Sequence, residues 1–281
     1  MTQTKRITAQ MLSCFARRLR EEERAPGTIE KYLRDVRAFS GWLEGRPVTR
    51  ETVCAWKEHL LLTHAPGTVN SMLASVNAFF SFAGWEDCRG KGLRLQRRLF
   101  REPGKELTRA EYERLLNAAR SQGQERLALL METVCATGIR VSEVRYITVE
   151  ALRTGRATVS LKGKIRSILI PGKLARKLLK YAQKQKIASG EIFLTRNGRG
   201  LSRKQIWAEM KALCVKAGVE PSKVFPHNLR HLFARAFYKA CKDVAKLADV
   251  LGHSSVETTR IYLISTGAEH ARQLERLGLV S

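Results

Sequence analysis

The chain has 281 residues, a length that suits two compact domains, and 44% of them are apolar, which excludes a disordered chain. Lys and Arg total 51 against 26 Asp and Glu, which gives a net charge of +25. This imbalance favours a polyanionic partner, above all nucleic acid, over the alternative of a generally basic surface.

The sequence predicts neither membrane insertion nor secretion. No segment approaches the roughly 18 uncharged apolar residues that a membrane span requires. Arg17, Arg18 and Arg20 fall where a signal peptide needs its apolar run, so we expect a cytoplasmic protein. The six cysteines show no CxxC spacing and are expected to be reduced core residues rather than disulfides or zinc ligands.

An internal repeat marks the first hundred residues. The segment 25–39 (APGTIEKYLRDVRAF) recurs at an offset of 40 as 65–79 (APGTVNSMLASVNAF). Each copy is typical of a helix, a Pro-Gly break and a second helix with a threonine N-cap, Thr28 or Thr68. Two such hairpins predict a four-helix domain over residues 1–88.

A basic segment follows, over residues 89–106, and its glycines and arginines are typical of an interdomain linker. A solvated charge run is the alternative. We expect the linker to lie along a phosphate backbone, because it joins two basic domains. The DNA-contacting residues expected there are Arg94, Arg97, Arg98 and Arg101.

The second domain, residues 107–264, opens with a capping box at Thr108 and Glu111 and a helix to Ser121. A second helix is predicted over 125–137. Strand character follows from Arg145 to Pro171. Segments 157–161 and 165–170 flank the hairpin tip 162–164, and helices resume from Leu174. The expected fold is mainly α with a small antiparallel β-sheet.

Four stretches interrupt the apolar helices with polar and basic residues: 136–144 (ATGIRVSEV), 160–166 (SLKGKIR), 226–234 (PHNLRHLFA) and 251–262 (LGHSSVETTRIY). A zinc site is not expected, because Asn228 stands where an HExxH motif needs glutamate and no third ligand lies nearby. A Walker loop is also missing from the sequence. The candidate catalytic residues in these stretches are Arg140, Lys162, His227, Arg230, His253 and Tyr262.

This set suits metal-free transesterification of a phosphodiester. Two guanidinium groups can bind the nonbridging oxygens and stabilise a pentavalent transition state. A lysine at a hairpin tip can protonate the departing oxygen. A tyrosine hydroxyl can act as the nucleophile where a base or a strong electrostatic field activates it.

The motifs TGIRVSE, HNLRH and LGHSS…TTRIY, in this order, resemble the signature boxes of the tyrosine recombinases, the phage integrase family. The helical repeat is similar to that family's SAM-like core-binding domain, and the second domain to its mixed α/β catalytic domain. The resemblance implies that Tyr262 attacks the scissile phosphate and forms a 3′-phosphotyrosyl link. It assigns phosphate binding to Arg140, Arg230 and His253, and the base to His227. No cofactor is implied, neither ATP nor metal.

Three residues have secondary assignments. Glu143 matches the acidic residue of the first box and is expected to orient Arg140 rather than to react. His231 is expected to be structural. Lys162 is preferred to Lys164 as the general acid, in a hairpin tip one residue shorter than the family's KGNK form.

The resemblance also implies partners: double-stranded DNA sites, a homotetramer with a dimer on each site, and a location in the bacterial nucleoid. The tail 265–281 is expected to be a helix exchanged between protomers. A directionality factor or a partner recombinase is a further partner left open. A mobile-element integrase is favoured, with a Xer-type chromosome resolvase, a non-catalytic DNA-binding protein and a type IB topoisomerase as alternatives.

Overall fold

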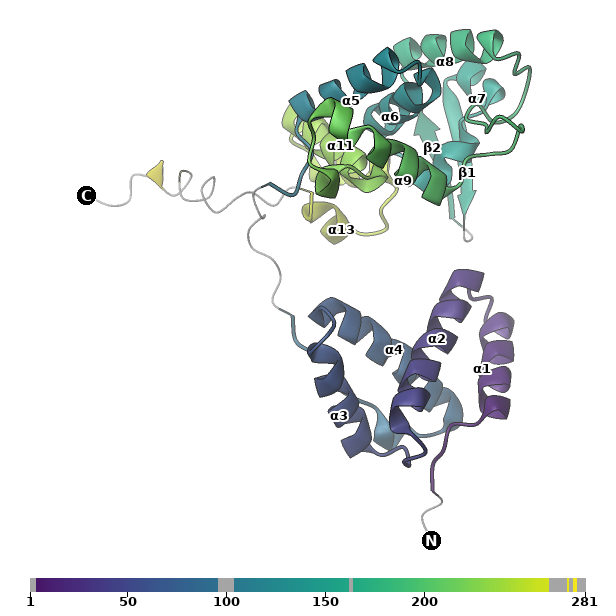
Figure 1. Cartoon of the computed structure of the whole chain (residues 1–281), viewed down its shortest axis with the longest axis vertical. Helices are drawn as coiled ribbons and strands as arrows, with labels where there is room; N and C mark the ends of the chain where they lie inside the picture. The colour runs from purple at the N-terminus through teal and green to yellow at the C-terminus, as the bar shows by residue number, and fades with distance from the viewer. Residues whose placement is uncertain (1–3, 96–103, 162–163, 263–271, 273–274, 277–281) are drawn as a thin grey trace. The chain divides into compact units, whose positions relative to one another are not determined.

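The computed structural model describes residues 4–95, 104–161, 164–262, 272 and 275–276. The chain divides into two compact units, Met1–Arg97 and Arg98–Ser281. Helices dominate both, and the described residues add one two-stranded antiparallel sheet in the second unit (Figure 1). The predicted fold class is therefore confirmed. In this described part of the chain no helix is long and apolar enough to cross a membrane.

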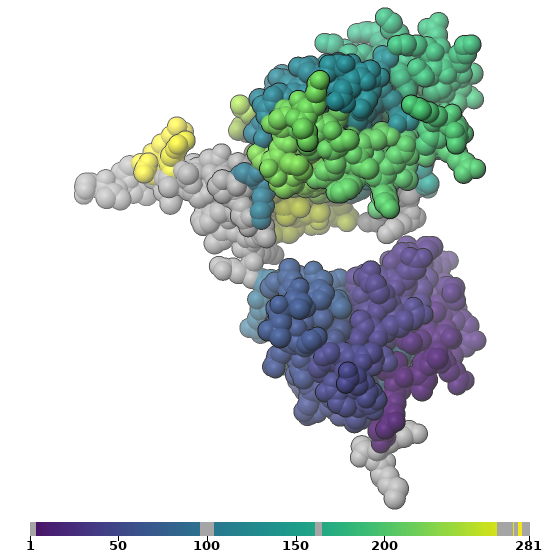
Figure 2. Space-filling view, viewed as in Figure 1, coloured from purple at the N-terminus to yellow at the C-terminus, as the bar shows by residue number. Residues whose placement is uncertain are grey.

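The first unit is a bundle of four helices, α1 (Ala9–Glu21), α2 (Pro26–Leu43), α3 (Arg50–Leu61) and α4 (Pro66–Ala83). In the space-filling view the helices of this unit form a closely packed surface (Figure 2). Phe39, Trp56 and Phe80 are buried in its core and contact one another through Phe39. Buried Asp35 on α2 accepts hydrogen bonds from Lys31 Nζ at 2.7 Å and from Ser75 Oγ on α4 at 2.8 Å. This network fixes the register of α2 against α4.

The two copies of the sequence repeat form equivalent helix starts. Both α2 and α4 begin at the proline of the Ala-Pro-Gly-Thr segment, with the preceding alanine as N-cap and no side-chain cap hydrogen bond. The predicted N-caps Thr28 and Thr68 are therefore wrong. Proline has a backbone angle that suits the first helical position, so each helix starts three residues earlier than expected.

The second unit is built around α6 (Glu125–Thr137), which is buried on most sides and packs against α5 (Arg109–Ser121), α8 (Gly172–Lys184) and α11 (Pro226–Cys241). The predicted capping box is present at the start of α5. Thr108 Oγ1 accepts from the Glu111 backbone N–H at 3.2 Å, and Glu111 Oε2 accepts from that of Thr108 at 2.8 Å.

The sheet consists of β1 (Arg156–Leu161) and β2 (Lys164–Leu169). Lys164 pairs with Leu161 and so belongs to β2 rather than to the predicted three-residue tip. Strand character between Arg145 and Arg156 is wrong, because Val149–Thr154 forms helix α7. The Thr148 hydroxyl caps this helix and Gly155 ends it in the left-handed conformation, two local signals that outweigh strand propensity.

The remaining helices are short, and the last two of them carry the fourth motif. They are α9 (Arg203–Ala212), α10 (Cys214–Ala217), α12 (Val244–Leu251) and α13 (Val256–Arg260), with 3-10 turns η1 (Glu86–Cys88), η2 (Val141–Tyr146) and η3 (Pro221–Lys223). A small apolar cluster of Ala234, Leu247 and Leu251 joins α11 to α12. This cluster brings the third and fourth motifs together.

Candidate active site

The first motif turns sharply at the end of α6. Gly138 has φ of +64°, and a Cβ at this position would lie 2.4 Å from Cδ1 of Phe233. Only glycine fits a left-handed turn this close to a ring. The turn buries Ile139 and starts Arg140 in an extended conformation, as the N-cap of η2.

Glu143 holds Arg140 in place. Its Oε2 accepts the Arg140 backbone N–H at 2.7 Å, and its Oε1 accepts Nη1 of the same residue at 3.1 Å. The Glu143 side chain is 2% exposed, and burial raises its pKa. Hydrogen bonds from Arg140 and Arg166 outweigh that effect, so the net pKa lies below the ordinary value and the carboxylate is ionised.

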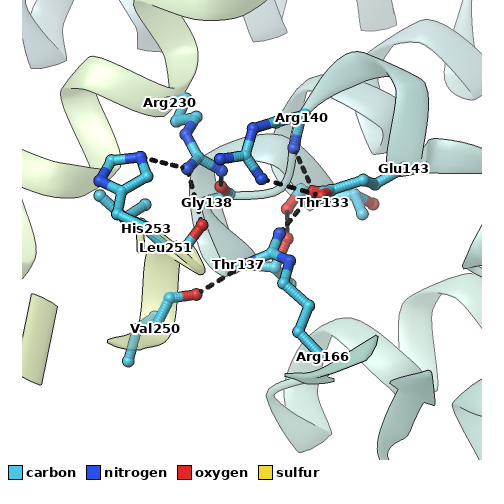
Figure 3. Close-up of polar contacts among 10 residues, drawn as sticks. All are labelled: Thr133, Thr137, Gly138, Arg140, Glu143, Arg166, Arg230, Val250, Leu251 and His253. Atoms are coloured by element: carbon cyan, nitrogen blue, oxygen red, sulfur yellow. Dashed lines mark hydrogen bonds and ion pairs between the residues drawn. The ribbon is translucent and has the colours of Figure 1, made fainter. Parts of the chain in front are cut away.

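Arg230, on α11, is a buried arginine with 1% exposure. It donates to the carbonyl oxygen of Gly138, from Nη2 to the carbonyl of Leu251 at 2.8 Å, and from Nη2 to His253 Nε2 at 2.9 Å (Figure 3). All three acceptors are neutral. Arg230 therefore joins three motifs and keeps its positive charge available for an anion.

His253 lies just after the C-terminus of α12, behind Gly252 in the left-handed conformation. Its Nδ1 and the hydroxyl of the buried Thr259 are 2.8 Å apart. Because Arg230 donates to Nε2, that nitrogen is the acceptor and Nδ1 carries the proton, which it donates to Thr259. The imidazole is thus fixed in orientation and tautomer.

Tyr262 is 3% exposed, and its ring is enclosed by the three histidines of the motifs. It stacks on His253 at a centroid distance of 5.7 Å and an interplanar angle of 14°. His231 meets it edge-on at 4.5 Å, and His227 lies at 6.1 Å. Burial lowers the pKa of Arg230, and the neighbouring Tyr262 side chain acts in the opposite direction.

The three histidines are neutral at physiological pH. Burial, followed by the positive charge of Arg230 and other neighbours, lowers the pKa of His253 to about 4. Burial and His227 lower that of His231 to about 4 as well. Desolvation, then Arg230 and Arg140, lower the pKa of His227. Across the described ranges, no group of three His, Cys, Asp or Glu side chains could hold a metal ion.

The structure brings together five of the six candidate catalytic residues. Lys162 lies outside the described residues, as do Arg97, Arg98 and Arg101 of the linker and most of the tail 265–281. Arg94 is described and exposed. His231, which we expected to be structural, lies 4.7 Å from His227, ring centroid to ring centroid, and faces Tyr262.

Two further residues contact this site, and the sequence motifs give neither of them a role. Thr259 orients His253. Arg166 on β2 pairs with Glu143 (Figure 3). A signal for Arg166 was present in the sequence, because strand alternation puts it on the same face as the buried Ile168. A charged residue on the buried face of a strand points to a specific partner.

Two family models match the chain. The model described as the phage integrase family covers residues 105–269, and the phage integrase N-terminal SAM-like domain covers 12–87. Tyrosine recombinase XerC of Roseiflexus castenholzii is 30% identical, over 90% of this chain and 88% of its own length. Tyrosine recombinase XerA of Thermococcus kodakarensis is 29% identical, over 90% of each chain.

Solved structures share the fold. A lambda integrase tetramer bound to a Holliday junction matches with a TM-score of 0.73 at 18% identity, over 90% of this chain and 76% of that one. XerH site-specific recombinase bound to its difH substrate matches with a TM-score of 0.69 at 17% identity, over 95% and 84%. The family model over residues 105–269 and the 30% identical XerC confirm the resemblance in the motifs: the chain belongs to the phage integrase family and is a tyrosine recombinase.

Proposed function

We propose that this recombinase cleaves and rejoins DNA strands at specific sites through a 3′-phosphotyrosyl intermediate on Tyr262. The main evidence for this proposal is the position of Tyr262. Its ring stacks on His253 at 5.7 Å, and His253 accepts a hydrogen bond from Arg230 at 2.9 Å. A buried tyrosine against a buried arginine has the positive field that a phenolic nucleophile needs.

In the cleavage step, Tyr262 Oη forms a bond to the scissile phosphorus, and the bond from phosphorus to the 5′ oxygen breaks. Arg140 and Arg230 bind the nonbridging oxygens and stabilise the charge of the pentavalent transition state. Arg230 is bonded to neutral acceptors in the free site, so a phosphate can displace them without breaking an ion pair. His253, held by Thr259, completes the phosphate contacts.

Two proton transfers accompany cleavage. His227 accepts the proton of the Tyr262 hydroxyl, which its lowered pKa supports, because a neutral imidazole is a competent base at pH 7. Lys162 gives a proton to the departing 5′ oxygen. Rejoining is the reverse: a 5′-hydroxyl from the partner duplex attacks the phosphotyrosyl link and Tyr262 leaves. The bond energy stays in the covalent link, so no ATP is consumed.

The partner is double-stranded DNA in the nucleoid, bound as a dimer on each site and as a tetramer during exchange. The net charge of +25 supports a polyanionic partner. The solved relatives support the assembly, since a lambda integrase tetramer is bound to a Holliday junction and XerH to its difH substrate. In this scheme residues 1–88 clamp the duplex, 89–106 follow its backbone, 107–264 carry the chemistry, and the tail 265–281 links protomers.

Two biological roles fit this chemistry, and each has an observation in its favour. The high arginine content and short hairpin support an integrase of a mobile element. Similarity to XerA and XerC over 90% of the chain supports a Xer-type chromosome resolvase. Deletion of the gene separates the two roles. A resolvase mutant accumulates chromosome dimers, whereas an integrase mutant loses only excision and integration of its element.

The test is covalent trapping. Purified full-length protein is mixed with nicked duplexes made from the DNA flanking its gene, and the products are run on a denaturing gel. A slow-migrating band that disappears in Tyr262→Phe establishes the tyrosyl-DNA link. Tight, site-selective binding with no band on these or on chromosome-dimer sites, with and without a host partner recombinase, would favour a non-catalytic DNA-binding protein instead.

A further inference from the structure

Arg166 is an arginine on the inner face of β2, and its side chain is 15% exposed. It pairs with Glu143, which also binds Arg140, and it donates from Nη1 to the carbonyl oxygen of Val250 at 3.0 Å (Figure 3). These partners lie 23 and 84 positions away in the sequence. One side chain thus connects three separate segments of the catalytic unit.

The first connection passes through Glu143 to Arg140. Glu143 Oε2 is shared between the Arg140 backbone N–H and Arg166, while Oε1 takes the Arg140 side chain. With both carboxylate oxygens occupied and the side chain 2% exposed, Glu143 has little freedom to reorient. The position of Arg166 therefore determines where Glu143 holds the Arg140 guanidinium.

The second connection leads to His253. Val250 lies in the last turn of α12, next to Leu251, whose carbonyl oxygen binds Arg230. Gly252 follows with φ of +63°, and a Cβ there would lie 2.4 Å from Cδ of Arg166. The Arg166 stem therefore packs against the turn that carries His253, three residues after Val250.

The hairpin is the third segment. Arg166 is the third residue of β2, which starts at Lys164 directly after the tip 162–163, and it pairs with Val159 of β1. Its Nε is buried and has no hydrogen-bond acceptor in the described part of the chain. A buried donor without an acceptor lowers the stability of the fold. If Arg166 served stability alone, we would not expect its Nε to be left without an acceptor.

We propose that Arg166 is a positioning residue that aligns the Arg140 guanidinium, the His253 turn and the β1–β2 hairpin relative to one another. Its action in DNA cleavage rests on the proposed function of the site. It touches no reacting atom in this scheme. It affects the cleavage rate by placing other groups, because a catalytic group displaced by on the order of 1 Å can slow a reaction by about 100-fold.

The first arm of the test measures single-turnover cleavage of nicked duplex and DNA affinity for Arg166→Gln, Arg166→Lys and Arg176→Gln. Arg176 is an exposed arginine of α8 and supplies a charge-matched control. We expect Arg166→Gln to cleave roughly 100-fold more slowly than the control, with equal affinity for DNA. Arg166→Lys should lie between them, because lysine keeps the charge but not the two-pronged geometry.

Coupling to Glu143 distinguishes positioning from a general loss of stability. If the two residues act as one unit, Arg166→Gln combined with Glu143→Gln should slow cleavage no more than the worse single variant. Multiplicative losses, or cleavage by Arg166→Gln within about threefold of the control, would overturn the proposal. Thermal unfolding verifies that each variant is folded at the assay temperature. If Arg166→Gln does not fold, the cleavage rate of Arg166→Lys is compared with that of the control instead, and an equal rate would overturn the proposal.

The second arm needs no DNA. The charged groups acting on His253 are Arg230, Arg140, Arg166 and His227, and the Tyr262 ring covers one face. Titration of ¹³C-labelled histidines by NMR should show a higher His253 midpoint in Arg166→Gln than in Arg166→Lys or the control. Equal midpoints would overturn the connection between Arg166 and His253 on which the proposal rests. If the wild-type protein cleaves no DNA, the proposed function fails, and this titration still tests that connection.

Discussion

Arg230 Nη2 donates a hydrogen bond to His253 Nε2 across 2.9 Å, and the two residues lie 23 positions apart in the chain. The bond makes Nε2 an acceptor, so the proton of the neutral imidazole is on Nδ1 and is donated to Thr259. A buried positive charge and a neutral histidine are thereby stabilised together. This pairing has consequences for both catalysis and pH dependence.

Acid should destabilise the protein through these histidines. The pKa of His253 is about 4 in the folded chain and about 6.5 when unfolded. Between these values the unfolded state binds a proton that the folded state does not, so stability falls as pH drops from about 6.5 towards 4. Thermal unfolding from pH 7.5 to 4.5 should show this loss, with a shallower slope in His253→Gln. Parallel slopes would contradict it.

Tyr262→Phe should abolish the covalent product while leaving DNA affinity unchanged, because it removes the nucleophilic oxygen and keeps the buried ring. Tyr238→Phe is the matched control, since Tyr238 packs against the same apolar cluster of α11 and α12. The control should cleave at the wild-type rate. Covalent product from Tyr262→Phe would show that another residue is the nucleophile.

Replacing Arg140 and replacing Arg230 should have similar effects on the cleavage rate but different effects on the free energy of unfolding. Arg140→Gln and Arg230→Gln should each slow cleavage by about 100-fold or more. The Arg140 side chain is 41% exposed and Arg166 still pairs with the buried Glu143 carboxylate, so loss of Arg140 should cost only about 1 kcal/mol of the free energy of unfolding. Loss of Arg230 leaves two buried carbonyl groups without a donor and should cost roughly 3 kcal/mol. Denaturant unfolding measures the difference, and equal losses of stability would contradict it.

Gly138→Ala should destabilise the catalytic unit by roughly 2–4 kcal/mol, because alanine is strained at φ of +64° and its Cβ would collide with Phe233. It should also reduce cleavage, since the Gly138 carbonyl binds Arg230. Gly41→Ala in α2 is the control. A Cβ there meets open space, so alanine should stabilise the helix by up to about 1 kcal/mol.

DNA affinity should depend on salt through the linker. Replacing all four predicted linker arginines by glutamine should reduce the slope of log affinity against log salt by up to about 4, one unit for each phosphate that is no longer neutralised. Arg176→Gln should change the slope by less than about 1. Filter binding from 50 to 300 mM salt measures both slopes. An unchanged slope in the fourfold variant would remove the linker from the interface. The four residues are Arg94, Arg97, Arg98 and Arg101.

Local signals in the sequence determined most helix boundaries and the family. The capping box of Thr108 and Glu111 and the glycine at position 138 are contained within a few residues, so their structures follow from backbone physics alone. The same locality explains the failures. Proline at the first position moved the starts of α2 and α4, and Thr148 with Gly155 made a helix where strand propensity predicted none.

The sequence by itself therefore determined the residue types in the motifs, the order of the motifs, the mainly helical fold and the recombinase family. Only the tertiary structure decided how those residues meet: Tyr262 among three histidines, Arg230 on the Gly138 carbonyl 92 positions away, and Arg166 on Glu143. These interactions join segments that are distant in the chain. Hydropathy and turn propensity are local properties, so they carry no information about which buried charge will find which partner.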